Sequence, residues 1–303
     1  MVSSQNLGWR YKVEHMLCMK EGHLDVPFFV RDSVLTVRRS DLKRGYDFMN
    51  TKEKIIQALE EAKGKYVSGE SLADDLGLSR NAVWKAINDL KKSGYNIESV
   101  RNRGYMLNES SDIISKAGIA LCLHRKVSDS IANEMLDKLC VYDNLDSTNT
   151  QAKRELVVGN FEISHKTVIV ARTQSFGRGH GGTGFDSPDG GIYLSIILDP
   201  DMLCVTAPIT ETVADMVTSV LEELYGVKCD RKKDNSLYVG KKKICGILTE
   251  AVSDLETGVY SSYIAGIGIR SDILCSASSL RPSKNLVIAT LMAGFSKMST
   301  SNT

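Results

Sequence analysis

The sequence predicts an α+β protein in which an N-terminal winged helix-turn-helix precedes a domain with a mixed sheet flanked by helices. Three observations support this: helical apolar spacing broken by a glycine turn over residues 51–95, two short strand-like runs around a basic turn over residues 95–107, and strand-like apolar runs beyond residue 140. A chain of 303 residues is long enough for about two domains. We place an irregular extension at 1–48, a DNA-binding domain at 49–110 and a larger domain at 111–303. The extension could come from a misplaced translation start or be a partner-binding arm.

Composition limits the classes of function. The formal net charge is only +1, so a nucleic-acid or ligand site must come from a local cluster. The seven cysteines form no C-x-x-C pair, which favours reduced thiols in a cytoplasm over a disulfide framework, and we expect no zinc or other metal site. We expect no signal peptide and no membrane segment, because no apolar run reaches the roughly 20 residues that a spanning helix needs.

The region after Met49 has the pattern of three helices. Ser68 or Ser71 is the expected N-cap of the second helix, Gly77 supplies the left-handed residue of the turn, and Ser79 caps the third helix. Two helices joined by such a turn are typical of a helix-turn-helix. The apolar residues expected to face inward are Ile55, Ile56, Leu59, Leu72, Ala73, Leu76, Val83, Ile87 and Leu90.

Basic residues cluster where such a domain would meet DNA. Arg80, Asn81 and Lys85 lie early in the third helix and are expected to face a major groove. Arg101 and Arg103 lie in the turn "RNRG", the expected tip of the wing, where they would contact phosphate or the minor groove. The alternative is a winged helix used only for protein contacts. Trp84 is expected to be a core or edge packing residue, because tryptophan in a small domain is usually structural.

A glycine-rich loop, "FGRGHGGTGFDSPDGG", separates two apolar runs. Gly177, Gly179 and Gly182 satisfy G-x-G-x-x-G, with Asp199 about 20 residues on, but that dinucleotide motif needs a helix to open at the glycines. The following glycines and Pro188 exclude a helix, so we reject this interpretation. A loop that becomes ordered around an anion and an ordinary surface hairpin remain equally open.

A family resemblance bears on this choice. The segment "SGESLADDLGLSRNAVWKAINDLKKSGYNIESVRNRGYML" resembles the DNA-binding domain of the biotin operon repressors, which are bifunctional biotin protein ligases. The later segments "DSTN", "TQSFGRGHGG", "GKKKICGILTEA" and "YIAGIGI" resemble the ordered motifs of the same family's ligase domain. The resemblance covers about residues 50–298 and implies a class II synthetase-like biotin ligase fold.

The resemblance implies a two-step chemistry in which ATP activates biotin as biotinyl-5′-AMP and biotin then passes to a lysine of a biotin carboxyl carrier protein. It implies that Lys243 and Arg178 are catalytic and that Arg178 and Asn235 lie on the nucleotide side, with Mg²⁺ expected to accompany ATP. Lys243 is preferred over its neighbours Lys241 and Lys242 only because of its position before "CGIL". The residues implied to contact or enclose biotin are Ser147, Thr148, Asn149, Gln174, Gly177, Gly179, His180, Gly246 and Gly266.

The sequence departs from the family pattern on the nucleotide side. His180 and Thr183 stand where the family loop carries arginines, so Arg178 is the one arginine of the three that remains. In "KKDNS", Lys233 and Ser236 stand where the family has tryptophan and aspartate, and Arg270 replaces the asparagine that follows "GIGI". Each lost charged contact to phosphate would be worth about 1.5–3 kcal/mol. We also expect the family's C-terminal SH3-like barrel to be missing, because the sequence stops just after the closing helix.

These observations lead to one preferred function and two alternatives. The preferred function is a cytoplasmic biotin–[acetyl-CoA-carboxylase] ligase that is also a biotin-responsive repressor, with a carrier protein, operator DNA and a second copy of the chain as partners. The first alternative is a catalytically impaired paralogue that acts as a DNA-binding biotin sensor. The second is an inactive remnant.

Overall fold

The computed structural model describes residues 50–157, 165–205, 207–253 and 260–298, together with the backbone of three short strands near the N-terminus. In place of the irregular extension expected over residues 1–48, those strands form an antiparallel sheet of order β1-β2-β3. Both β2 and β3 contain valine and β2 also contains phenylalanine, residue types that favour extended backbone. The rest of residues 1–48 lies outside the described residues. The three strands are β1 Met19–Lys20, β2 His23–Val30 and β3 Ser33–Arg38.

The winged helix-turn-helix is confirmed. Of the two candidate caps for α3, Ser68 is the correct one, since its side chain accepts the hydrogen bond from Ser71 N. Gly77 has a φ of 63°, as the turn requires, and Ser79 caps α4. The predicted apolar face is buried in one cluster, with Leu76 partly buried at its margin. The elements are α2 Thr51–Glu61, α3 Gly69–Leu76, α4 Arg80–Lys92, β4 Ile97–Val100 and β5 Gly104–Leu107.

The second part of the chain is a seven-stranded mixed sheet of order β6-β7-β8-β12-β11-β10-β9, in which β6 and β7 are parallel and the other neighbours are antiparallel. Its strands are β6 Leu139–Leu145, β7 Val168–Gln174, β8 Ile192–Leu198, β9 Asp230–Arg231, β10 Leu237–Val239, β11 Lys242–Ser253 and β12 Tyr260–Ile269. The helices around it are α5 Lys116–Leu123, α6 Asp129–Asp137, α7 Thr148–Val157, α8 Ile209–Tyr225, α9 Ser271–Ala277 and α10 Lys284–Ser296, with short 3₁₀ turns at His180–Gly182 and Pro200–Met202.

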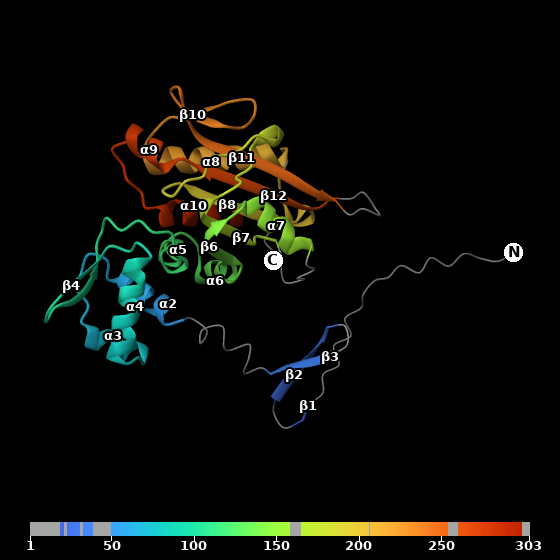
Figure 1. Ribbon diagram of the computed structural model, residues 1–303. Helices are drawn as coiled ribbons and strands as arrows, with labels where there is room; N and C mark the ends of the chain where they lie inside the picture. Colours follow the sequence, from blue (N-terminus) through green and yellow to red (C-terminus); the bar gives the residue numbers. More distant parts are fainter. Residues whose placement is uncertain are drawn as a thin grey trace.

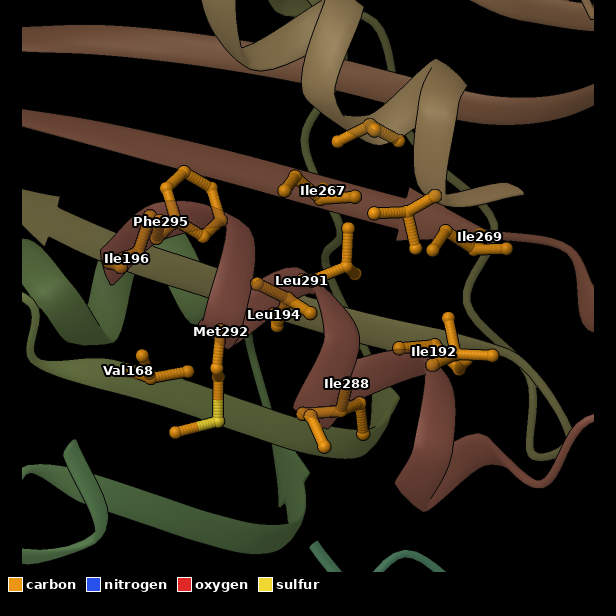
Figure 2. Close-up of a cluster of buried hydrophobic side chains, with 14 of the residues drawn as sticks. Val168, Ile192, Leu194, Ile196, Ile267, Ile269, Ile288, Leu291, Met292 and Phe295 are labelled. Atoms are coloured by element: carbon orange, nitrogen blue, oxygen red, sulfur yellow. The ribbon is translucent and has the colours of Figure 1, made fainter. Parts of the chain in front are cut away.

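Both faces of the central strands are buried. Successive side chains of a strand alternate between faces, so Val168 and Val170 enter the main core while Ile169 enters a smaller cluster beneath α7. The main core lies between the sheet and helices α8 and α10, and Figure 2 shows Ile288, Leu291 and Phe295 of α10 packed against the side chains of β8 and β12. This burial explains why β8 is apolar at every position except Ser195.

The two parts of the chain pack on each other through α5 (Figure 1). Ala117 of this helix is buried in the winged-helix core, whereas Ile119 and Leu123 are buried in the main core. Polar contacts reinforce the junction: Lys63 Nζ donates to Ser111 O at 2.7 Å and Arg172 Nη1 donates to Ser93 O at 3.4 Å. Among the described residues, no helix has the length and apolarity needed to cross a membrane.

Candidate functional site

The main pocket lies where β7 ends and α7 begins, over the neighbouring strands β12 and β11. In the sheet, only β8 separates β7 from β12, so residues far apart in the sequence reach the same site. The pocket is lined by Ser147, Thr148, Asn149, Gln174, Arg178, Gly179, His180, Phe185, Asp234, Ser236, Lys243, Gly246, Ile247, Leu248, Gly266, Ile267 and Gly268.

One wall is the start of α7, where the "DSTN" segment turns from strand to helix. Ser147, Thr148 and Asn149 are buried polar residues at this helix start. Thr148 N donates to Gln174 Oε1 at 2.8 Å, which ties the helix to the end of β7. A helix N-terminus lined by hydroxyl and amide groups offers several hydrogen-bond partners to a polar ligand.

The glycine-rich loop folds back on itself beside this wall. Gly179 N donates to Thr183 O at 2.7 Å, Phe185 N donates to Gly177 O at 2.8 Å, and Gln174 N donates to Ser187 O at 3.1 Å. Its short 3₁₀ turn contains Gly181 at a φ of 64°, which breaks helical geometry, so the rejection of the dinucleotide motif is confirmed. The folded loop carries Arg178 and His180 to the mouth of the pocket.

Phe185 of the same loop lies in a slot that only glycine permits. A Cβ atom on Gly246 would lie 2.7 Å from the Phe185 ring, and one on Gly268 would lie 2.4 Å from it. The closeness of the loop to the sheet therefore depends on bare backbone in β11 and β12. Phe185 is itself in edge-to-face contact with Tyr193 of β8, at 6.4 Å between ring centroids.

The opposite wall carries one cationic and one anionic side chain. Lys243 comes from the start of β11 and Asp234 from the turn between β9 and β10. Ser236 donates to Asp234 Oδ1 through its Oγ at 2.6 Å. This hydrogen bond, helped by the charge of Lys243, holds the pKa of Asp234 below its usual value, so that this end of the pocket carries a carboxylate at neutral pH.

The structure brings most of the predicted site residues together. Of the residues implied for catalysis and biotin binding, all except Gly177 line the main pocket. Gly177 instead lines a second, more open pocket formed by the glycine-rich loop, and a Cβ atom on it would be 2.3 Å from Phe185 O. Asn235 of the nucleotide side does not line the pocket either; its φ of 58° places it at the tip of a tight turn, and its neighbours Asp234 and Ser236 face the pocket instead.

Sequence reasoning did not single out several residues of the site. Phe185, Asp234 and Gly268 line the pocket, and Ser195 lies fully buried behind it. Within "KKDNS", Ser236 is buried while Lys233 is exposed. The sequence of β8 contained one signal that could have identified Ser195: it is a polar residue inside an otherwise apolar buried strand.

The predicted DNA-contacting residues are all exposed on α4 and on the β4–β5 turn. Arg80 is ion-paired with Glu70, and Arg103 lies over the Tyr66 ring at 4.1 Å. The expectation that Trp84 is a core or edge packing residue is wrong, because Trp84 is 60% exposed. It follows Arg80 by four positions and Asn81 by three, so it shares their face of the helix.

Comparison with known proteins defines the class of each part. Residues 51–106 match the family described as HTH domain, and residues 141–268 match the biotin/lipoate A/B protein ligase family. The chain therefore carries a helix-turn-helix domain followed by a domain of the biotin/lipoate A/B protein ligase family.

Two curated relatives have the same combination in their names. The chain is 35% identical over 217 residues to the bifunctional ligase/repressor BirA of Bacillus subtilis (strain 168), which covers 71% of this chain and 63% of that protein. It is 30% identical over 210 residues to the protein of the same name from Escherichia coli (strain K12), covering 69% and 60% respectively. The chain thus spans less than two thirds of the length of these relatives.

A likeness to a solved structure is also found. The crystal structure of biotin acetyl coenzyme A carboxylase synthetase from Helicobacter pylori with bound biotinylated ATP has 26% sequence identity and a TM-score of 0.43, over 53% of this chain and 74% of that one.

Proposed function

We propose that this protein is a biotin protein ligase, forming biotinyl-5′-AMP from biotin and ATP and transferring biotin to a carrier protein, and that it also binds operator DNA. The observation that carries the first part is the pocket itself. It joins a wall of hydrogen-bonding groups at the start of α7 to a charged end formed by Arg178, Lys243 and Asp234. The two relatives named as ligase/repressor support the combination of both activities.

Adenylation requires a charged end next to a ligand-binding wall, and the pocket has this arrangement. The biotin carboxylate must approach the α-phosphate of ATP, and cationic groups must offset the repulsion of the two anions. Lys243 and Arg178 are the cations of the pocket lining, and the loop that carries Arg178 closes over bare glycine backbone. Mg²⁺ is expected to enter with ATP, and the Asp234 carboxylate is of the type that this ion prefers. The mixed anhydride would be shielded from water by the loop.

The function is tested on the full chain by titration calorimetry with biotin alone and with biotin plus ATP, while pyrophosphate release is followed in the same samples. We expect tighter binding when both substrates are present, and pyrophosphate release that requires both. Biotin binding without pyrophosphate release would favour the alternative function of a DNA-binding biotin sensor. His180 and Thr183, at positions where the family resemblance implies arginines, are the reason to consider this alternative. Absence of both signals would contradict the proposal.

The second activity predicts a measurable change in salt dependence. Arg101 is exposed at the tip of the wing, where it would neutralise one phosphate. In Arg101→Ala, the slope of log K against log [salt] for duplex DNA should become shallower by about 0.9, because one fewer counterion is released on binding. The measurement is fluorescence anisotropy with labelled duplex DNA over a series of salt concentrations.

The matched control for this experiment is Arg125→Ala, an exposed arginine between α5 and α6 and outside the winged helix. Its slope should equal that of the unchanged protein. Equal slopes for both variants would mean that the wing does not contact phosphate, and would favour the alternative of a winged helix that contacts only protein.

A further inference from the structure

The amide of Asn149 is held from two sides by residues of two different strands. Ser195 of β8 donates from its Oγ to Asn149 Oδ1 at 2.5 Å. On the other side, Asn149 Nδ2 donates to Glu250 Oε2 of β11 at 2.8 Å. Lys153, one turn further along α7, donates to the second oxygen of Glu250 at 2.6 Å. Neither Ser195 nor Glu250 lines the pocket, so both act on it through Asn149.

The chemistry of Ser195 and Glu250 determines which of them faces the oxygen of the Asn149 amide and which faces its NH₂ group. Burial raises the pKa of Glu250, but the hydrogen bonds from Lys153 and Asn149 outweigh it and leave the pKa below its usual value. The charged carboxylate only accepts hydrogen bonds, so it must face the NH₂ group of Asn149. The oxygen of Asn149 therefore faces Ser195, whose single hydroxyl hydrogen it receives.

This assignment also orients Thr148. Its Oγ1 lies 2.7 Å from Ser195 Oγ, whose only hydrogen is already donated to Asn149, and 3.2 Å from Gln174 Oε1, which can only accept. The single hydroxyl hydrogen of Thr148 therefore goes to one of these two oxygens and not into the pocket. The hydroxyl oxygen of Thr148 and the amide oxygen of Asn149 keep unused lone pairs, while their hydrogens point toward neighbouring protein oxygens. Both residues line the pocket, and this part of its wall is thus an acceptor surface.

We infer that Ser195 and Glu250 are positioning residues that set the specificity of the pocket for a ring carrying N–H donors, as in the cyclic urea of biotin, over a ring without donors, such as the dithiolane of lipoate. The inference rests on the proposed function and deepens it. The matching family includes both biotin and lipoate ligases, so the fold alone does not determine which of the two ligands is bound. A wall of hydrogen-bond acceptors disfavours a ring without N–H donors, because the buried lone pairs of the wall stay unpaired when that ring is bound.

The test uses calorimetry on the full chain and on the variants Ser195→Ala and Glu250→Gln, with biotin, dethiobiotin and lipoate as ligands. Dethiobiotin keeps the cyclic urea but lacks the sulfur ring. We expect both variants to bind the two urea ligands about 10-fold more weakly, the loss of roughly one hydrogen bond to a polar ligand. Lipoate binding should be unchanged, so the preference for urea ligands over lipoate should fall about 10-fold.

Controls separate a positioning role from a structural one. Glu223→Gln removes an exposed carboxylate on α8 and should leave all three affinities unchanged. Ser195→Thr keeps the hydroxyl and should restore most of the urea preference. Ser195 is fully buried, so Ser195→Ala could unfold the protein. Glu250 is partly exposed, and the Glu250→Gln variant then still tests the inference.

The outcomes distinguish the inference from the proposed function. Failure of the unchanged protein to bind biotin would overturn the function itself. Biotin binding by the unchanged protein, combined with an unaltered urea preference in the two variants, would overturn only the inference. Equal loss of all three ligands together with a lowered melting temperature would also overturn it, because that result indicates a purely structural role.

Discussion

Replacement of Lys243 by alanine is expected to lower biotin-dependent pyrophosphate release about 10²–10³-fold, the range seen when one preorganised group that stabilises developing charge is removed. Lys243 lies at the charged end of the pocket, and its Cε atom comes within 3.7 Å of a Cβ built on Gly246. Its ammonium group is proposed to lie between the carboxylate and the α-phosphate during adenylation. Initial rates at saturating biotin and ATP measure the effect.

Lys241→Ala is the matched control. Lys241 belongs to the same run of lysines and is also exposed, but it does not line the pocket. Its rate should stay close to that of the unchanged protein. If both variants lost activity to the same degree, the effect would come from the general positive charge of the run, and the assignment of Lys243 as the catalytic lysine would be wrong.

Replacement of Gly266 by alanine is expected to weaken biotin binding about 10- to 100-fold. The new Cβ would lie 2.2 Å from Asn149 Oδ1, so the amide must move. The backbone of Gly266 cannot retreat, because it is paired with Ser195 on one side and Leu248 on the other. Moving Asn149 breaks its bonds to Ser195 and Glu250, each worth about 1–3 kcal/mol when the partner is buried or charged.

Calorimetric titration with biotin measures this effect, with thermal denaturation as a check on folding. Gly184→Ala is the control, since nothing lies within 4 Å of its built Cβ and it has no left-handed φ. Its biotin affinity should change by less than about 2-fold, within the range of a neutral surface substitution. An unchanged affinity in Gly266→Ala would mean that Asn149 does not contact the ligand.

The fold was largely predictable because its signals are local. The caps Ser68 and Ser79, the left-handed Gly77 and the spacing of Val83 and Ile87 each depend on residues within a few positions along the chain. The same holds for the alternation between strand and loop around the glycine-rich segment. Hydrophobic period and turn chemistry determine such elements before any tertiary contact forms.

The site was predictable only where a motif marks it. Thr148, Gln174 and Lys243 stand in motifs that the family resemblance identifies, whereas Ser195 reaches the site through the pairing of β8 with β12. Asp234 enters the pocket because Ser236 orients it, and Trp84 faces solvent because the inner face of α4 is already filled by Val83, Ile87 and Leu90. These facts depend on strand register and on competition for space, which no short stretch of sequence contains.

Helix α5 couples the folding of the winged helix to the folding of the second part of the chain. Its Ala117 is enclosed by the winged-helix core and its Ile119 and Leu123 by the main core, so unfolding of either part exposes apolar surface of the other. A ligand that binds the folded pocket at a concentration 100 times its dissociation constant adds about 2.7 kcal/mol to the stability of the protein. Through α5, part of that stabilisation extends to the winged helix, so the fraction of chains with a folded winged helix rises with the concentration of ligand.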